Sequence, residues 1–160
     1  MNRRLRRTIL SLHIVGGVGL LGLCAAIVLI HLRALTMADP LPAYELLVST
    51  PLLGISLSFV SLLSGLALGL SSKWGVLRYR WVTAKLVLNL SVIGVGAFVL
   101  GPQTAAMADG TGGSETALIL GSGYDVAALL LATGLSVFKP GRPRTAPGTA
   151  RRRTDRTVSA

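Results

Sequence analysis

The chain has few charged and few aromatic residues. Of its 160 residues, 14% are charged and 5% are aromatic, whereas a soluble domain is about 25% charged. The single cysteine, Cys24, excludes an intrachain disulfide and a cysteine-based metal cluster. The sequence also lacks a glycine-rich nucleotide loop, paired carboxylates and a Ser/His/Asp arrangement. We therefore expect a membrane protein without catalytic activity, although an enzymatic role stays open.

Acidic residues are scarcer than basic ones. The chain carries 16 Lys and Arg against 6 Asp and Glu, which gives a net charge of +10. Such an excess indicates an anionic partner, either nucleic acid or a membrane surface. The placement of the basic residues along the chain has to decide between the two.

Four long apolar runs lie at about 9–30, 46–70, 81–100 and 117–137. Each has about 20 residues or more, which is enough for a helix to cross a hydrocarbon core of ~30 Å. We predict an all-α polytopic membrane protein, a bundle of four transmembrane helices in one domain over 1–138. The Pro-, Gly- and Arg-rich segment 139–160 is expected to be a disordered basic tail.

The basic residues gather on one side of this topology. Four precede the first run, three lie between the second and third, and seven follow the fourth, so that only Arg33 and Lys85 are left over. Because cytoplasmic loops are enriched in Lys and Arg, both termini are predicted to be cytoplasmic, in the inner (plasma) membrane. Anionic lipid headgroups then account for the positive charge, and nucleic acid is not needed as a partner.

Small residues form a stripe along the second run. Close van der Waals contact holds helices together in lipid, where tails are as apolar as leucine. Spacings of three and four residues place them on one helix face. The stripe consists of Gly54, Ser58, Ser61, Gly65 and Gly69. We expect it to face another helix of the chain, with a homo-oligomer or another membrane protein as the alternative partner.

Polar residues within the apolar runs are the best indications of function, because ionisable groups in hydrocarbon need a partner or a task. His13 and Lys85 each lie about four residues inside their runs from the basic side, roughly 6 Å deep at ~1.5 Å per residue. Asn89 lies one turn deeper than Lys85 on the same face. We expect His13 and Lys85 to border one polar pocket. Asp125 lies nearer the other side and is expected to bond Ser or Tyr groups or to be protonated.

The segment "WGVLRYRWVTAK" leads into the third run. Trp74 and Trp81 in it are typical of interfacial anchors, because indole rings favour the headgroup region. For Lys85, the alternative to a pocket is a side chain that extends to the headgroups. For His13, the alternative is a neutral imidazole bonded to a neighbouring helix.

The stretches "LHIVGGVGLLG", "SLLSGLALGL" and "KWGVLRYRWVTAKLVL" together resemble a family of small four-helix membrane proteins of unassigned function, common in actinobacteria. More distantly, the chain resembles the copper-resistance D-type proteins and the four-helix bacterial protoporphyrinogen oxidases, which share a histidine in the first helix and a lysine in the third. That resemblance implies haem or porphyrin binding, with His13 as the metal ligand, Lys85 beside it and Asn89 nearby.

One departure from this pattern concerns the second axial ligand. Members of the unassigned family often have a further histidine late in the third helix, and this chain has none there. His31 lies ~27 Å from His13 along the helix axis, so the two cannot clamp one haem. We therefore expect no resident cofactor, and keep a haem-binding redox protein and a small transporter or accessory subunit as alternatives.

Overall fold

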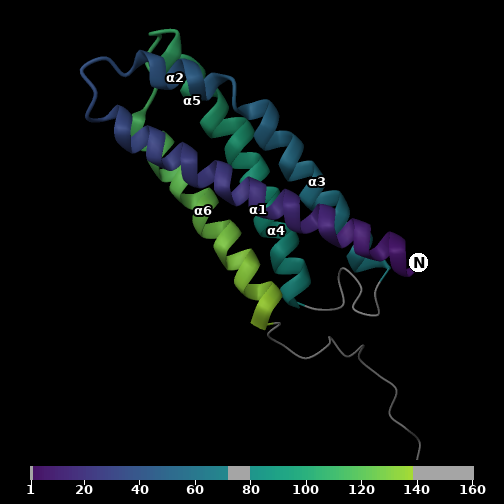
Figure 1. Cartoon of the computed structure of the whole chain (residues 1–160). Coiled ribbons are helices and arrows are strands. Elements are labelled where there is room, and N and C mark those ends of the chain that lie inside the picture. Colours follow the sequence, from purple (N-terminus) through teal and green to yellow (C-terminus); the bar gives the residue numbers. More distant parts are fainter. Residues whose placement is uncertain (1, 72–79, 139–160) are drawn as a thin grey trace, which may run out of the picture.

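The computed structural model describes residues 2–71 and 80–138, and every regular element in these ranges is helical (Figure 1). Four helical segments are long and apolar enough to cross a membrane: Arg3–Ala34, Pro51–Leu70, Arg80–Ala108 and Glu115–Phe138. The predicted all-α four-helix membrane bundle is thereby confirmed, and the chain is a multi-pass membrane protein. Trp74 and the predicted tail at 139–160 lie outside the described residues.

The first helix extends beyond its apolar run at both ends. Helix α1 spans Arg3–Ala34, and the side chain of Asn2 caps it by accepting a hydrogen bond from the Arg4 amide at 3.3 Å. The predicted range of 9–30 was too short because hydropathy marks the part in lipid rather than the end of the helix. Arginine is a good helix former, so the basic first turns continue the same helix.

The predicted helix at 46–70 is divided in two. Helix α2 spans Leu41–Val48 and helix α3 spans Pro51–Leu70. Between them, the hydroxyls of Ser49 and Thr50 donate to the carbonyls of Leu46 and Leu47 at 2.7 and 2.8 Å. Pro51 has no amide hydrogen to continue the earlier helix, and it suits the first turn of a new one. The prediction that one helix begins near residue 46 was therefore wrong.

The third membrane segment is longer than predicted and contains a widened turn. Helix α4 spans Arg80–Val95, a π-helical turn η1 spans Gly96–Leu100, and helix α5 spans Gly101–Ala108. The Gly101 amide donates to the Gly96 carbonyl, five residues back. Pro102 follows directly. In an ordinary α-helix its ring would clash with the carbonyl group four residues earlier. The helical segment extends to Ala108 and so passes the predicted end at residue 100.

The fourth membrane helix is α6, which spans Glu115–Phe138. A tight turn joins it to α5, and in that turn Gly110 and Gly112 have φ values of 67° and 95°, which favour glycine. The predicted range of 117–137 lies within α6.

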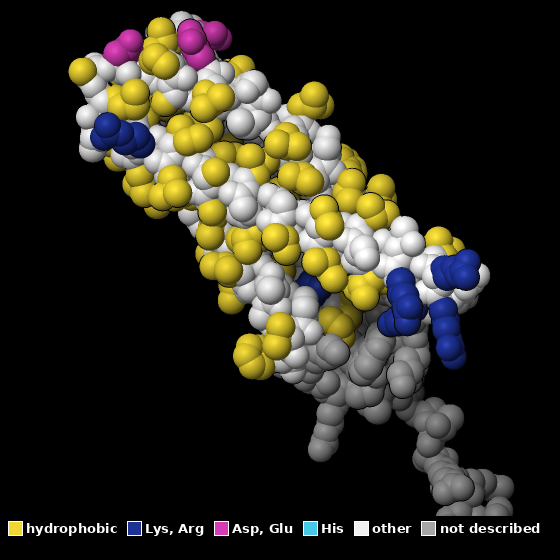
Figure 2. All heavy atoms as spheres, viewed as in Figure 1, with side chains coloured by type: hydrophobic (Ala, Val, Ile, Leu, Met, Phe, Trp, Pro, Cys, Tyr) yellow, Lys and Arg dark blue, Asp and Glu magenta, His cyan; other side chains and the backbone are white. Residues whose placement is uncertain are grey.

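Helix α1 packs on α3 and α6, and α6 packs in turn on α4 (Figure 1). Helices α2 and α5 pack on each other beyond the end of α1, and we call this pair the cap. Figure 2 shows acidic side chains gathered at the cap end and basic ones at the opposite end, where α1 begins. We call the opposite end the N-terminal end.

Two apolar clusters form the interior. The central cluster joins α1, α4 and α6, and its buried members are Leu20, Cys24, Val92, Ala128 and Leu129. The cap cluster joins the cap to α1 and α6, and its buried members are Ala34, Tyr44, Leu47 and Leu118. Most other large apolar side chains point outward, as expected where lipid replaces water.

The small-residue stripe on α3 allows close contact with α1, as predicted. A Cβ atom on Gly16 would lie 3.1 Å from the Ser61 amide nitrogen, so the two backbones are nearly in contact. A Cβ atom on Gly65 would lie 2.9 Å from Cε1 of the His13 ring. Glycine at these positions therefore provides the space in which α1 and α3 meet.

Candidate functional site

His13 connects α1 to α3 in the N-terminal half of the bundle. Its Nδ1 lies 2.9 Å from the carbonyl oxygen of Ser61 and 3.3 Å from Oγ of Ser64. A carbonyl can only accept, so Nδ1 donates, and the lone pair of the neutral imidazole is then on Nε2. The ring is half-buried against Gly65. The bond to a neighbouring helix is the one that the alternative interpretation of His13 predicts.

Lys85 and Asn89 both lie on α4, one turn apart, and both are half-buried. The side-chain oxygen Oδ1 of Asn89 is buried and has no hydrogen-bond partner in the structure. The pocket shared by His13 and Lys85 therefore stays a prediction.

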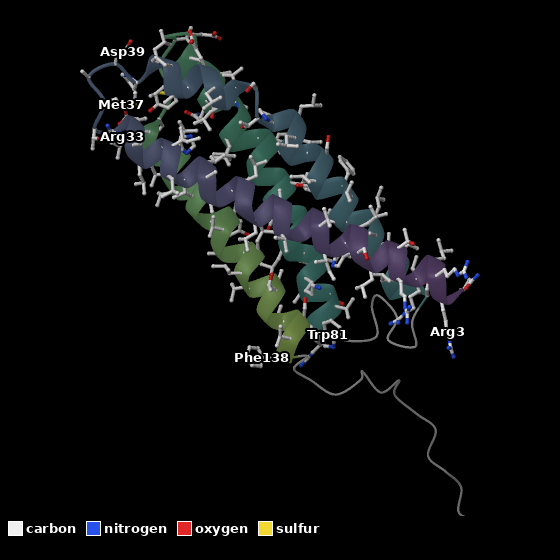
Figure 3. The ribbon with its side chains drawn as sticks, in the orientation of Figure 1. Arg3, Arg33, Met37, Asp39, Trp81 and Phe138 are labelled. Atoms are coloured by element: carbon white, nitrogen blue, oxygen red, sulfur yellow. The ribbon has the colours of Figure 1, made fainter. Side chains whose placement is uncertain are left out.

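Trp81 begins the membrane segment of α4 and lies at the N-terminal end, as Phe138 does (Figure 3). Arg33 and Asp39 lie at the cap end, and Arg3 lies at the N-terminal end (Figure 3). Trp81 therefore occupies the end of a membrane-crossing segment, where an interfacial anchor belongs. Trp74, the other predicted anchor, is outside the described residues.

Asp125 lies on α6 in the cap half of the bundle and is 3% exposed. Its Oδ1 is buried and has no hydrogen-bond partner. Of the groups expected to bond it, Tyr124 instead contacts Ser91 on α4 at 2.7 Å, and Ser122 contacts His31. The expected hydrogen bond of Asp125 to Ser or Tyr is therefore not what the structure shows at Oδ1.

His31 lies near the end of α1 and is 2% exposed. Its Nδ1 is 3.3 Å from Oγ of Ser122 on α6, and its Nε2 is buried without a partner. The hydroxyl of Ser122 has a single hydrogen, which it donates to the Leu118 carbonyl at 2.7 Å. With this hydrogen engaged, Ser122 accepts from Nδ1 of His31, and Nε2 of the neutral ring then carries a lone pair.

A cavity of about 90 Å³ is bordered by both His31 and Asp125. It lies between the central cluster and the cap cluster, because Leu20, Cys24 and Val92 of the first and Leu47 of the second border it. Its polar lining residues are Thr50, Ser58, Thr104, His31 and Asp125. The remaining lining is mostly apolar. The cavity has room for a few water molecules or for a ligand of a few heavy atoms.

The π-helical turn contributes one wall of this cavity. Gly96, Leu100 and Gly101 all border it. The widened turn and the two glycines, which lack side chains, leave space beside Thr104 that a regular helix with larger residues would fill. Single π-helical turns within α-helices occur frequently at functional sites.

His31 was not among the functional residues predicted from the sequence. It was considered only as a second haem ligand and dismissed by its distance from His13. Its partner Ser122 lies 91 residues away in the chain, so no local pattern connects the two. An available signal was that His31 and Asp125 both lie toward the acidic side of the predicted topology.

Haem was implied by resemblance, and the residues present fit it in part. The Nδ1 hydrogen bond of His13 to a carbonyl is the usual arrangement for a metal-ligating histidine. However, the cavity that the structure shows borders neither His13, Lys85 nor Asn89. Within 2–71 and 80–138, no three His, Cys, Asp or Glu side chains gather to hold a metal ion. Haem binding at His13 stays a prediction, and we derive no step through it.

Comparison of the chain with protein families, with curated proteins and with solved structures finds no match. The resemblance to actinobacterial four-helix proteins, and the more distant one to haem-binding relatives, therefore stays a prediction.

Proposed function

We propose that this protein binds a small hydrogen-bond-donating ligand inside the membrane, in the cavity between His31 and Asp125. The observation that carries the proposal is the pair of unpartnered atoms, His31 Nε2 and Asp125 Oδ1, on residues that border one cavity. A buried polar atom without a hydrogen bond costs about 1–3 kcal/mol. Two such groups beside one cavity are stabilised when the cavity contains a donor.

The position in the membrane supports a role for these residues. Ionisable side chains within transmembrane segments are rare and commonly mark the paths or binding sites of ions and solutes. His31 and Asp125 are contributed by two packed helices, α1 and α6, and lie only about one helical turn apart in depth. The proposal is compatible with a small transporter and with an accessory subunit that senses a solute.

The proposed orientation places the cavity in the outer half of the membrane. Acidic residues Asp39, Glu45, Asp109 and Glu115 are exposed at the cap end, whereas Arg3, Arg4, Arg6 and Arg7 are exposed at the N-terminal end (Figure 2). The positive-inside rule then supports cytoplasmic termini, with anionic headgroups as the partners of the arginines. The ligand would enter from the outer side or laterally from lipid.

The test is the melting temperature of the purified protein in lipid nanodiscs with small neutral molecules. Acetamide offers N–H donors, whereas acetone has a similar size and only accepts. We expect at least one small donor to raise the melting temperature by about 3 °C near tenfold its Kd, and acetone to have no effect. The proposal would be contradicted if donors and acetone had equal effects. It would also be contradicted if a donor stabilised the His31→Phe variant as much as it stabilises the wild type.

A further inference from the structure

The hydrogen-bonding groups of the cavity differ in what they offer. His31 presents a lone pair at Nε2, because Ser122 fixes the hydrogen on Nδ1. Asp125, when ionised, can only accept. The hydroxyls of Ser58 and Thr104, which also border the cavity, can both donate and accept. When Asp125 is ionised, a molecule bound there meets several acceptors and no obligatory donor, so it must supply several donors itself.

The charge around the cavity is also one-sided. None of the residues that line it is a lysine or an arginine. Arg33 is two residues from His31 but is exposed at the cap end, where it donates to Thr36 at 2.9 Å. The carboxylate of Asp125 therefore has no cationic side chain beside it in the cavity lining. A carboxylate in such a place is stabilised by a cation.

The size of the cavity limits the ligand further. A volume of about 90 Å³ accepts a compact group and excludes a large ring system. Most of the wall is apolar, formed by Leu20, Leu47, Val92 and Leu100 among others. A cation with a small alkyl group would contact this wall while its charged end contacts Asp125. Strongly hydrated metal ions, by contrast, would keep few oxygen ligands there.

We propose that the ligand of this cavity is a small protonated primary amine or ammonium ion, with N–H donors to Asp125 Oδ1 and His31 Nε2. This inference rests on the proposed function, since it names the chemical class of the ligand. The ammonium group of such a ligand has three or four N–H donors, which match the acceptors of the cavity. No covalent step is involved.

The experiment compares three probes on the same wild-type protein in nanodiscs at pH 7. Methylammonium has both charge and N–H donors, tetramethylammonium has charge without donors, and acetamide has donors without charge. We expect methylammonium to raise the melting temperature by about 3 °C near tenfold its Kd, acetamide to raise it clearly less, and tetramethylammonium not to raise it. Chloride is the counter-ion throughout, and sodium chloride of equal ionic strength is the reference.

The other outcomes distinguish this inference from the proposed function. If acetamide stabilises the protein as much as methylammonium does, the cationic ligand is wrong and the neutral donor site stands. If tetramethylammonium equals methylammonium, the N–H contacts are wrong. If no donor of either kind has an effect, both proposals are contradicted and the cavity holds water.

Two variants place the effect in the cavity. Asp125→Asn keeps the shape of the side chain and removes the charge, so methylammonium should lose its effect. Tyr124→Phe is the matched control, because Tyr124 is the neighbouring residue on α6 and its hydroxyl contacts Ser91 instead. If Asp125→Asn fails to fold, Thr104→Val replaces it in the test. We expect Thr104→Val to reduce the methylammonium-induced rise in melting temperature by at least half. An unchanged methylammonium response in the variant that folds would overturn the inference.

Discussion

The Nδ1 atom of His31 lies 3.3 Å from Oγ of Ser122, and His31 also borders the cavity. It also ties the cap end of α1 to α6, two helices that are 91 residues apart in sequence at this point. One hydrogen bond therefore serves both the assembly of the bundle and the chemistry of its cavity.

Replacement of Ser122 by alanine should weaken both functions of this contact. We expect Ser122→Ala to lower the free energy of unfolding by about 1 kcal/mol. Methylammonium binding should weaken about fivefold, because the His31 ring loses the acceptor that orients it. Ser136→Ala is the control, since the Ser136 hydroxyl bonds only within α6, to the Ala132 carbonyl at 2.9 Å. Melting curves with and without methylammonium measure both quantities. Equal behaviour of the two variants would show that Ser122 does not orient His31.

The contact of α1 with α3 predicts a difference between two glycines of the same helix. A Cβ at Gly16 would lie 3.1 Å from the Ser61 backbone, whereas a Cβ at Gly22 would meet nothing within 4 Å. Gly22→Ala should be neutral or stabilising, because alanine favours a helix by up to about 1 kcal/mol over glycine. Gly16→Ala should be less stable than Gly22→Ala by about 1 kcal/mol or more. Thermal unfolding in detergent measures this difference, and a reversed order would mean that the helices do not meet at Gly16.

The His13 ring predicts a compensating pair. A methyl group at Gly65 would lie 2.9 Å from the His13 ring and displace it from the Ser61 carbonyl. Gly65→Ala should therefore destabilise the wild type but cost much less when His13 is already alanine. A double-mutant cycle on melting temperature measures the coupling. Additive effects would contradict the packing of His13 on Gly65.

Haem binding has a direct spectroscopic test. We expect the protein purified from cells to show no Soret band, because the cavity that the structure shows is far from His13 and too small for a porphyrin. The control is the protein purified after addition of haem to the culture. A Soret band that disappears in His13→Ala and persists in His31→Ala would instead support the haem-binding alternative.

Reporter fusions test the orientation. A cytoplasm-active reporter fused after Ala160 should be active, and one inserted at the exposed turn residue Gly110 should be inactive. A periplasm-active reporter should show the opposite pattern, because the basic residues gather at the N-terminal end. The reverse result at both positions would place the cavity in the cytoplasmic half of the membrane.

The sequence was sufficient to predict the four membrane segments, because twenty consecutive apolar residues have few alternatives to a helix in lipid. It was also sufficient to predict the contact surface of α3, since glycine and serine recur on one helix face. The break before Pro51 and the π-helical turn before Pro102 were not predicted. A proline indicates where a helix is interrupted. Packing against neighbouring helices decides whether the helix ends there or continues through a widened turn.

The candidate site was harder to predict than the fold. Asp125 was identified because it interrupts an apolar run, and His13 because it lies within one. The environment of His31 depends on Ser122 and on the cap, whose Tyr44 and Leu47 pack in the cap cluster. Such contacts between distant segments leave no periodic pattern in the sequence.

The central claim is most directly tested by ¹⁵N NMR of the protein labelled at histidine, in nanodiscs, because the chain has two histidines. The spectrum of the His31→Gln variant assigns each ¹⁵N signal to one of the two histidines. We predict that His31 is the neutral tautomer protonated at Nδ1, and that methylammonium shifts its Nε2 signal while the signals of His13 stay unchanged. A His31 protonated at Nε2, or a Nε2 signal that no small donor shifts, would contradict a ligand held between His31 and Asp125.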